Sequence, residues 1–566
     1  MLKGFISKIS VLFLMATTMF LGIWGVANGS PPNPLDFGPY EYEFKDIDQG
    51  CNYDLDGTSL VWSDSPFYGS TTWTVAFGDT DFSGSDTRCG SPSTKVDMEV
   101  RVWYPGKGGE VADGGPFPFV AILHGQQIWT IEGYKGYDYL GQLLASHGFI
   151  VASIDGRSLL DSTIKSRGEH VREHLRRFVD RNEAGSGHFL EGQIDLDRTT
   201  VIGHSRGGDA VVATWEWQRV DPDPGYTIVA IVAIAPVQFF ARVGGEPSFI
   251  SHARDVAYQI IHGSKDGDVS DFQGYRQYDR AADIRAVGET PKSLVFVKDA
   301  NHNFFNSIWE TLEGDDYCCG GTLSGTNARN VAKAYIHSFL QVVVNGDLDY
   351  RGYLTGEYAN PIAGTTVNLD YQAPGSEFLA IDNYEELPGG AHDKTDNSCG
   401  GAVTSKKFEH YDERRFSSSD TSPFNTYKGE TYAGYIHWTT KKAKLWNQIL
   451  AACTPDPTVY PYLSFRIGQI YRSSGSPNPP GNQDLFVQIV DGSGVMSALV
   501  KASDYPNSIY PPWLTSEGGT KTVMGVIRIP LSAFTGIDLT NIQEVRFRFN
   551  NPKKGEIVVD NVCFTK

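Results

Sequence analysis

Residues 199–212 read TTVIGHSRGGDAVV: a short apolar run, a glycine-rich turn and the start of a helical segment. The run ending at Ile202 predicts a buried strand, and Asp209 to Val220 predict a helix. Gly203 and Gly207 flank Ser205, as a sharp strand-to-helix turn requires, because strained backbone and close helix approach leave no room for side chains. Ser205 is therefore a candidate nucleophile, and the alternative is a glycine turn with an incidental serine.

A base and an acid should follow such a serine, because its hydroxyl attacks well only when a histidine, oriented by a carboxylate, removes its proton. His302 lies just beyond the apolar run 293–297, at the expected carboxyl end of a strand. The loop after the preceding strand, 257–261, carries two carboxylates, Asp266 and Asp268. Either could orient the imidazole.

Attack on a carbonyl also places negative charge on its oxygen, which two backbone N–H groups can stabilise. One donor is expected from Arg206, the residue after the candidate nucleophile. The other is expected from Gln126, since Gly125 permits a tight turn after the apolar run 119–123. The alternative for this loop is an ordinary glycine turn at the end of a strand.

The wider pattern predicts two domains, because single cores rarely grow beyond roughly 250 to 300 residues and the chain has 566. From about residue 95 to 345, short apolar runs alternate with helical segments, as in a mostly parallel sheet covered by helices. Glycine, proline, asparagine and threonine dominate 346–375, and alternating strands follow. We therefore expect an α/β domain at 35–345, a linker at 346–375 and an antiparallel β-sandwich at 376–566.

Residues 1–29 predict a cleaved signal peptide, since two lysines precede a long apolar run and small residues follow it. An uncleaved membrane anchor is the alternative. The formal charge is −19, and removing this segment, which has two lysines and no acids, gives about −21. Nucleic acid is an improbable partner for so acidic a chain. We expect a secreted protein.

The sequence has seven cysteines, and export would place them where disulfides persist. At least one must lack a partner within the chain. Cys51 with Cys89 would close an N-terminal excursion, whereas Cys399, Cys453 and Cys563 fall in the C-terminal part. The spacing of the cysteines does not suggest zinc.

The motifs together resemble the α/β-hydrolase superfamily: His124-Gly125, the turn 203–208, Gly263-Ser264-Lys265-Asp266 and Asn301-His302-Asn303. The likeness is greatest to compact secreted esterases, namely polyester hydrolases and cutinases, dienelactone hydrolases and platelet-activating-factor acetylhydrolases. It implies Asp266 as the acid, from its usual offset, and neither a metal nor an organic cofactor. Polyester hydrolases carry a stacking tryptophan after the strand that follows the elbow helix, where this chain reads APVQFF (235–240).

The C-terminal part resembles jelly-roll modules of the galactose-binding type, including carbohydrate-binding modules, with residues 380–384 opening it and 558–562 closing it. This resemblance implies that Asp382 and Asp560 could share a structural calcium. The alternative is that both make hydrogen bonds at strand ends. Four aromatic residues could stack on sugars or pack inside the sandwich: Tyr471, Tyr505, Tyr510 and Trp513.

The expected function is hydrolysis of a carboxylic ester through an acyl-enzyme by Ser205, His302 and Asp266. The second domain suggests a polymeric target, such as an ester on a polysaccharide. A peptidase or lactonase with the same three residues is the competing enzyme hypothesis. A secreted adhesin on a hydrolase scaffold is the non-enzyme alternative.

Overall fold

The computed structural model describes residues 31–47, 59–62, 73–76, 98–127, 130–159, 164–220, 222–238, 253, 255–270, 272–281, 290–311, 321–384, 400–406, 410–415, 432–449, 454–470, 478, 480–507, 509–511, 513, 522–549 and 554–566. The predicted signal peptide, 1–29, lies outside these residues, as do six of the seven cysteines. Cys563 is described and has a free thiol. No helix in the described ranges is long and apolar enough to cross a membrane.

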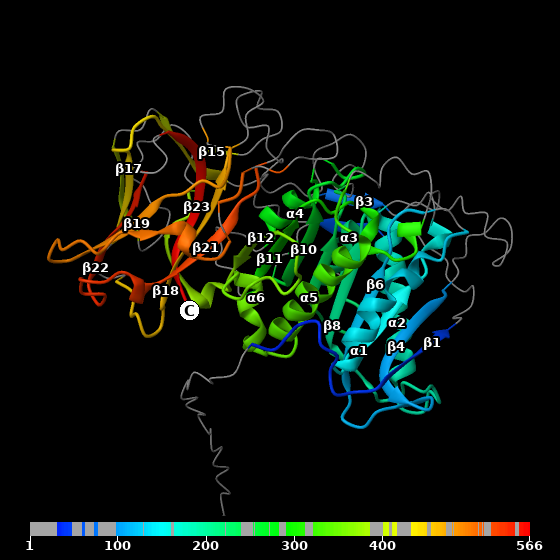
Figure 1. Ribbon diagram of the computed structural model, residues 1–566. Coiled ribbons are helices and arrows are strands. Elements are labelled where there is room, and N and C mark those ends of the chain that lie inside the picture. Colours follow the sequence, from blue (N-terminus) through cyan, green and yellow to red (C-terminus); the bar gives the residue numbers. More distant parts are fainter. Residues whose placement is uncertain are drawn as a thin grey trace, which may run out of the picture.

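A large mixed sheet forms one half of the molecule (Figure 1). Its six central strands, β7, β6, β8, β9, β10 and β11 in sheet order, run parallel, and the strands at both edges are antiparallel. The order is β1-β4-β7-β6-β8-β9-β10-β11-β12, with β5 paired to β4. The ten strands found in the described residues are β1 (Tyr42–Ile47), β4 (Val100–Lys107), β5 (Glu110–Val111), β6 (Phe117–Leu123), β7 (Ile150–Ile154), β8 (Ile194–His204), β9 (Ile228–Ile234), β10 (Ala257–Gly263), β11 (Lys292–Val297) and β12 (Val367–Gln372).

Helices cover both faces of this sheet. Alternate residues of β6 enter two separate cores: Phe119 packs with α2, α3 and α4, whereas Val120 packs with α1, α5 and α6. The α-helices are α1 (Asp138–Ser146), α2 (Ile164–Asn182), α3 (Arg206–Val220), α4 (Gly274–Arg280), α5 (Gly325–Val343) and α6 (Arg351–Thr355). Short 3-10 turns are η3 (Gly133–Tyr137), η4 (Arg157–Leu159), η5 (Asn303–Phe305), η6 (Trp309–Thr311) and η7 (Leu348–Tyr350). The mixed α/β class expected from the sequence is confirmed.

The expected linker at 346–375 is wrong, because this segment belongs to the α/β part. It contains η7, α6 and β12, and β12 extends the main sheet by pairing with β11. Val367, Leu369 and Tyr371 are buried in the core shared with α5. The turn-rich composition hid a six-residue edge strand whose hydrophobic residues alternate.

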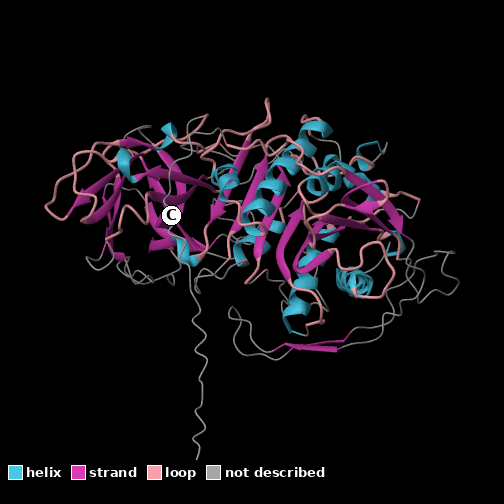
Figure 2. Ribbon diagram, turned by 90° about the horizontal axis from the view of Figure 1, so that it is seen from below, coloured by secondary structure: helices cyan, strands magenta, loops and turns pink. Residues whose placement is uncertain are grey.

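The C-terminal part consists of antiparallel sheets, which lie at one end of the molecule beside the main sheet and its helices (Figure 2). One sheet runs β15-β16-β23-β18-β21, with β13 on β23, and the other runs β14-β17-β22-β19-β20. The first contains β13 (Phe378–Asp382), β15 (His410–Arg415), β16 (Tyr432–Trp438), β18 (Tyr462–Gln469), β21 (Gly525–Pro530) and β23 (Gly555–Thr565). The second contains β14 (Gly400–Lys406), β17 (Lys444–Ile449), β19 (Phe486–Asp491), β20 (Val500–Lys501) and β22 (Ile542–Arg548). A separate ribbon pairs β2 (Ser59–Trp62) with β3 (Trp73–Ala76).

The two parts are joined by aromatic packing as well as by the chain. The ring of Trp513 stacks on Phe296 of β11, with 5.3 Å between centroids and 9° between planes. Tyr510 packs against the same core, and Tyr505 is partly buried and packs against the core of the C-terminal sheets. Three of the four candidate sugar-stacking aromatics are thus used in packing, and Tyr471 lies outside the described residues.

A buried charge cluster also crosses the junction. Arg466 of β18 is ion-paired with Asp370 of β12 at 2.8 Å and with Asp560 of β23 at 2.6 Å. Asp279 of α4 lies 3.8 Å from the same guanidinium, and the ammonium of Lys292 donates to the carbonyl of Asp279. Burial, with the neighbouring carboxylates, raises the pKa of Asp560 to about 7 despite its pairing with Arg466. The cluster thus contains two cations, Arg466 and Lys292, and three carboxyl groups. Its net charge is zero when one of the three carboxyl groups is protonated.

Candidate active site

Ser205 sits on the turn between β8 and α3 with a left-handed backbone, φ 57°. This conformation is costly for a residue with a side chain and is characteristic of a nucleophile elbow. A Cβ on Gly203 would overlap the carbonyl group of Gly207, and one on Gly207 would overlap the carbonyl of Leu123. Both glycines are therefore required by close backbone contacts around the turn.

His302 and Asp266 meet in the structure, with 2.8 Å between the imidazole Nδ1 and the carboxylate Oδ2. The other oxygen of Asp266 accepts hydrogen bonds from the backbone N–H groups of Asp268 and Val269. Burial opposes the charged carboxylate, but the charge and hydrogen bond of His302 and the nearby His262 lower the pKa of Asp266 to about 2. Asp266 is thus an anion held on the Nδ1 side of the imidazole.

Asp268, the alternative acid, lies on the other side of the same ring. Its Oδ2 is 3.4 Å from Nε2 of His302, and its side chain is 51% exposed. The geometry therefore separates the two carboxylates that the sequence left open. Asp266 faces the nitrogen that an orienting acid should face, and Asp268 faces the nitrogen that would exchange protons with a serine.

The side chain of His204 links the turn that carries Ser205 to the loop that carries His302. Its Nε2 donates to the carbonyl of His302 at 3.1 Å. The hydroxyl of Tyr137 lies 3.1 Å from the other ring nitrogen, and Trp309 packs on the ring. Burial, with the charge of His302, lowers the pKa of His204 well below its usual range, so the ring stays neutral. The backbones on either side of Ser205 and His302 are thereby held together.

The loop after β6 lies directly against Ser205. A Cβ on Gly125 would be 2.6 Å from Cβ of Ser205, so the two residues are in close contact. The ring of His124 donates from Nδ1 to the carbonyl of Gly125 at 2.8 Å, while its Nε2 accepts from the N–H of Gly156. The N–H of Gln126 belongs to the same peptide unit as that carbonyl and points the opposite way. His124 therefore fixes the direction of the Gln126 N–H.

Two arginines share the side chain of Gln126. Its Oε1 accepts from Arg167 at 2.7 Å and from Arg206 at 3.2 Å. Arg167 is buried and also donates to the carbonyl of Leu159 at 2.9 Å. The residues that carry both expected oxyanion donors are thus linked through their side chains, which the sequence gave no means of predicting.

Gly125→Ala is expected to reduce ester hydrolysis at least about tenfold, because the added methyl group must displace Ser205 or the loop that faces it. The measurement is kcat/KM on p-nitrophenyl acetate. Gly481→Ala is the matched control, since a Cβ there meets no atom within 4 Å. Equal activity of the two variants would contradict the close contact.

The expected calcium ligands have separate partners. Asp560 pairs with Arg466, whereas Asp382 accepts from Asn447 at 2.6 Å and from the N–H of Tyr384 at 3.0 Å. The described ranges contain no group of three or more His, Cys, Asp or Glu residues that could hold a metal ion.

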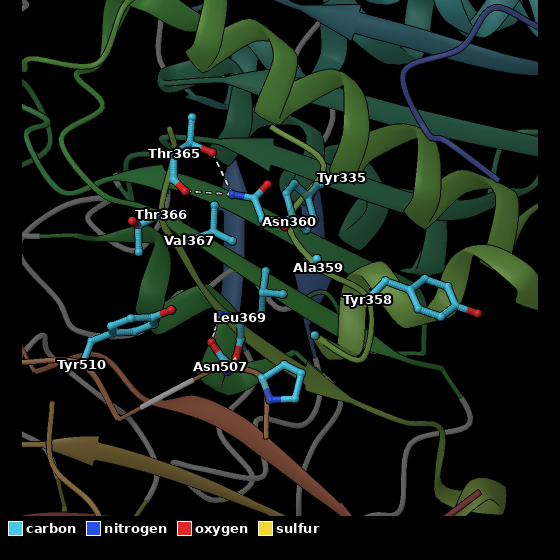
Figure 3. Close-up of a pocket in the computed structure, with 12 residues that line it drawn as sticks. Tyr335, Tyr358, Ala359, Asn360, Thr365, Thr366, Val367, Leu369, Asn507 and Tyr510 are labelled. Atoms are coloured by element: carbon cyan, nitrogen blue, oxygen red, sulfur yellow. Dashed lines mark hydrogen bonds between the residues drawn. The ribbon is translucent and has the colours of Figure 1, made fainter. Parts of the chain in front are cut away.

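A cavity of about 190 Å³ lies away from these residues, at the junction with the C-terminal sheets (Figure 3). Polar side chains that line it are hydrogen-bonded within the protein. Asn507 accepts from the N–H of Leu369 and donates to its carbonyl, and Asn360 donates to Thr365. The cavity is part of the domain junction.

The mixed sheet with helices on both faces, and a strained serine between β8 and α3, are features that this chain shares with α/β hydrolases. Residues 101–238 match a protein family described as PET hydrolase-like. This segment includes Gln126, Ser205 and Arg206 and ends before Asp266 and His302.

Curated relatives match over a shorter length. The chain is 36% identical over 80 residues to Cutinase 1 of Thermobifida cellulosilytica, covering 13% of this chain and 29% of the relative. It is 36% identical over 80 residues to a Cutinase of Thermobifida fusca (strain YX), covering 13% and 25%. Cutinase 2 of Thermobifida cellulosilytica is 38% identical over 80 residues, covering 13% and 29%. The chain thus spans little more than a quarter of the length of these relatives.

Proposed function

We propose that this chain is a secreted serine hydrolase that cleaves carboxylic esters through an acyl-enzyme. Ser205 attacks the carbonyl carbon, His302 takes the hydroxyl proton on Nε2, and Asp266 holds the imidazole with its proton on Nδ1. His302 then gives that proton to the leaving alcohol, and water repeats the sequence to release the acid. The observation that carries the proposal is the 2.8 Å contact between Asp266 and His302, on a loop that His204 ties to the elbow.

The N–H groups of Gln126 and Arg206 bind the oxyanion in this proposal. The support is local: Gly125 packs on Ser205, and its carbonyl is turned toward His124, so the Gln126 N–H faces away from that ring. Arg206 is the first residue of α3, where N–H groups point out of the helix end. Each donor contributes a few kcal/mol to transition-state stabilisation when correctly placed, about 3 kcal/mol in typical cases.

An accessible polyester is the substrate class that the cutinase and PET hydrolase-like relatives favour. The stretch after β9 reads APVQFF (235–240), so the stacking tryptophan of polyester hydrolases is missing, and Phe239 and Phe240 are the aromatic residues that could substitute for it. Val237 is buried and its N–H donates to the carbonyl of Ser205 at 3.3 Å. An aliphatic polyester has no aromatic ring that would need a stacking tryptophan, so we propose it as the preferred substrate over an aromatic one.

A substrate panel tests the proposal. Purified protein is incubated with p-nitrophenyl acetate, an aliphatic polyester film, PET film, an acetylated polysaccharide, a lactone and a peptide anilide. Turnover of the acetate and the aliphatic film, with little release from PET, is expected. Cleavage of the anilide or lactone alone would favour the competing enzymes, and failure on every substrate would favour the adhesin.

A further inference from the structure

The imidazole of His302 lies between two carboxylates. Asp266 is buried and meets Nδ1 at 2.8 Å, whereas Asp268 is half exposed and meets Nε2 at 3.4 Å. The position of Asp268 is fixed by the acid itself, since its backbone N–H donates to Oδ1 of Asp266 at 3.0 Å. The orienting acid therefore also places a second negative charge on the working side of the base.

We propose that Asp268 is a positioning residue that pairs with the protonated imidazole of His302 and thereby sets the lowest pH at which the enzyme works. The proposal rests on the proposed function, since it assigns His302 as the base. A protonated Nε2 cannot accept the proton of Ser205. A carboxylate that stabilises the protonated ring therefore keeps the enzyme inactive to a higher pH.

The other groups near His302 do not have this effect. Asp266 acts on the opposite nitrogen and remains charged throughout the working range of pH, so it adds a constant influence. His204 lies 5.0 Å away between ring centroids and is neutral because it is buried. His262 contacts Asp266 at 3.3 Å rather than Nε2. Of the described groups, Asp268 is the exposed charge that reaches the nitrogen facing the substrate.

The test is the pH dependence of kcat/KM on p-nitrophenyl acetate, read at the isosbestic wavelength, for the wild type and Asp268→Asn. Asparagine keeps the size of the side chain and removes its charge. The acid limb of the variant is expected about half a pH unit lower, the size typical of a half-exposed ion pair. At a pH well below the limb, the variant should then be about threefold faster than the wild type.

Two controls make the result specific. Asp113→Asn removes an exposed carboxylate before the amino end of β6, away from the carboxyl ends of the strands where His302 lies. This variant should have the same acid limb of the pH profile as the wild type. High salt should move the wild-type limb toward that of Asp268→Asn and leave the variant unchanged.

The proposal is overturned if Asp268→Asn has the wild-type limb, or loses the same fraction of activity at every pH. The proposed function fails separately: in that case the wild type has no turnover at any pH, so there is no limb to compare.

Discussion

Ser205→Ala is expected to lower kcat for p-nitrophenyl acetate by roughly 10⁴- to 10⁶-fold, because the acyl-enzyme cannot form without the hydroxyl. The residual rate should come from the N–H groups of Gln126 and Arg206, which still bind the oxyanion. His302→Ala should cost a similar factor. The double variant should be little worse than either single one, since the two residues act as a unit.

Folding must be separated from chemistry in this experiment. Alanine is smaller than serine and fits the same left-handed turn, so the circular dichroism and unfolding midpoint should be close to those of the wild type. A p-nitrophenyl phosphonate provides a second measurement: the wild type should release one equivalent of p-nitrophenol and gain the phosphonyl mass on the peptide carrying Ser205. Labelling of another serine, or undiminished turnover by a folded Ser205→Ala, would refute the assignment.

Arg466→Met is expected to destabilise the protein by about 3–5 kcal/mol, because it leaves Asp370 and Asp560 buried with one cation fewer. The loss should be visible in both halves of the molecule, since the guanidinium bridges a strand of the main sheet and two strands of the C-terminal sheets. The measurement is urea unfolding, followed by tryptophan fluorescence and by residual esterase activity.

An exposed ion pair is the matched control for Arg466. Lys107 pairs with Glu41 at 2.7 Å, and the two side chains are 75% and 66% exposed. Lys107→Met should leave the unfolding midpoint close to that of the wild type. Adding Asp370→Asn and Asp560→Asn to Arg466→Met should recover part of the loss, because the carboxylates left behind carry most of the cost. A midpoint unchanged by Arg466→Met would show that the cluster does not join the two parts.

This cluster changes how the C-terminal part is viewed. Its resemblance to a carbohydrate-binding module suggested a separable accessory domain, yet Trp513 packs on the hydrolase core and Arg466 pairs with a carboxylate of the main sheet. Removing residues 376–566 would expose Phe296 and would leave Asp370, near Lys292, without its partner Arg466. A truncated enzyme would therefore report on stability as much as on substrate targeting.

Apart from the two-residue β5, the strands of the main sheet from β4 to β11 could be predicted because each contains a run of buried apolar residues bounded by turns. β12 could not, because alternate residues of this strand, Asn368 and Asp370, are polar although they are buried against the C-terminal part, and a turn-rich stretch precedes it. β14 to β17 were not predicted either, because their residues follow no regular polar and apolar alternation. Strands made of apolar residues are recognisable from composition, whereas these strands depend on what they pack against.

The sequence by itself predicted the elbow, the order of the candidate serine, acid and histidine, and the mixed α/β class of fold, because glycine placement and apolar periodicity are local properties. Taken as residues alone, Asp266 and Asp268 were both candidates for the acid, and the family resemblance favoured Asp266 from its usual offset. Only the tertiary structure decided that one faces Nδ1 and the other Nε2, that His204 bonds the carbonyl of His302, and that Arg466 joins two domains. These depend on the relative positions of loops far apart in the chain, which no local pattern encodes.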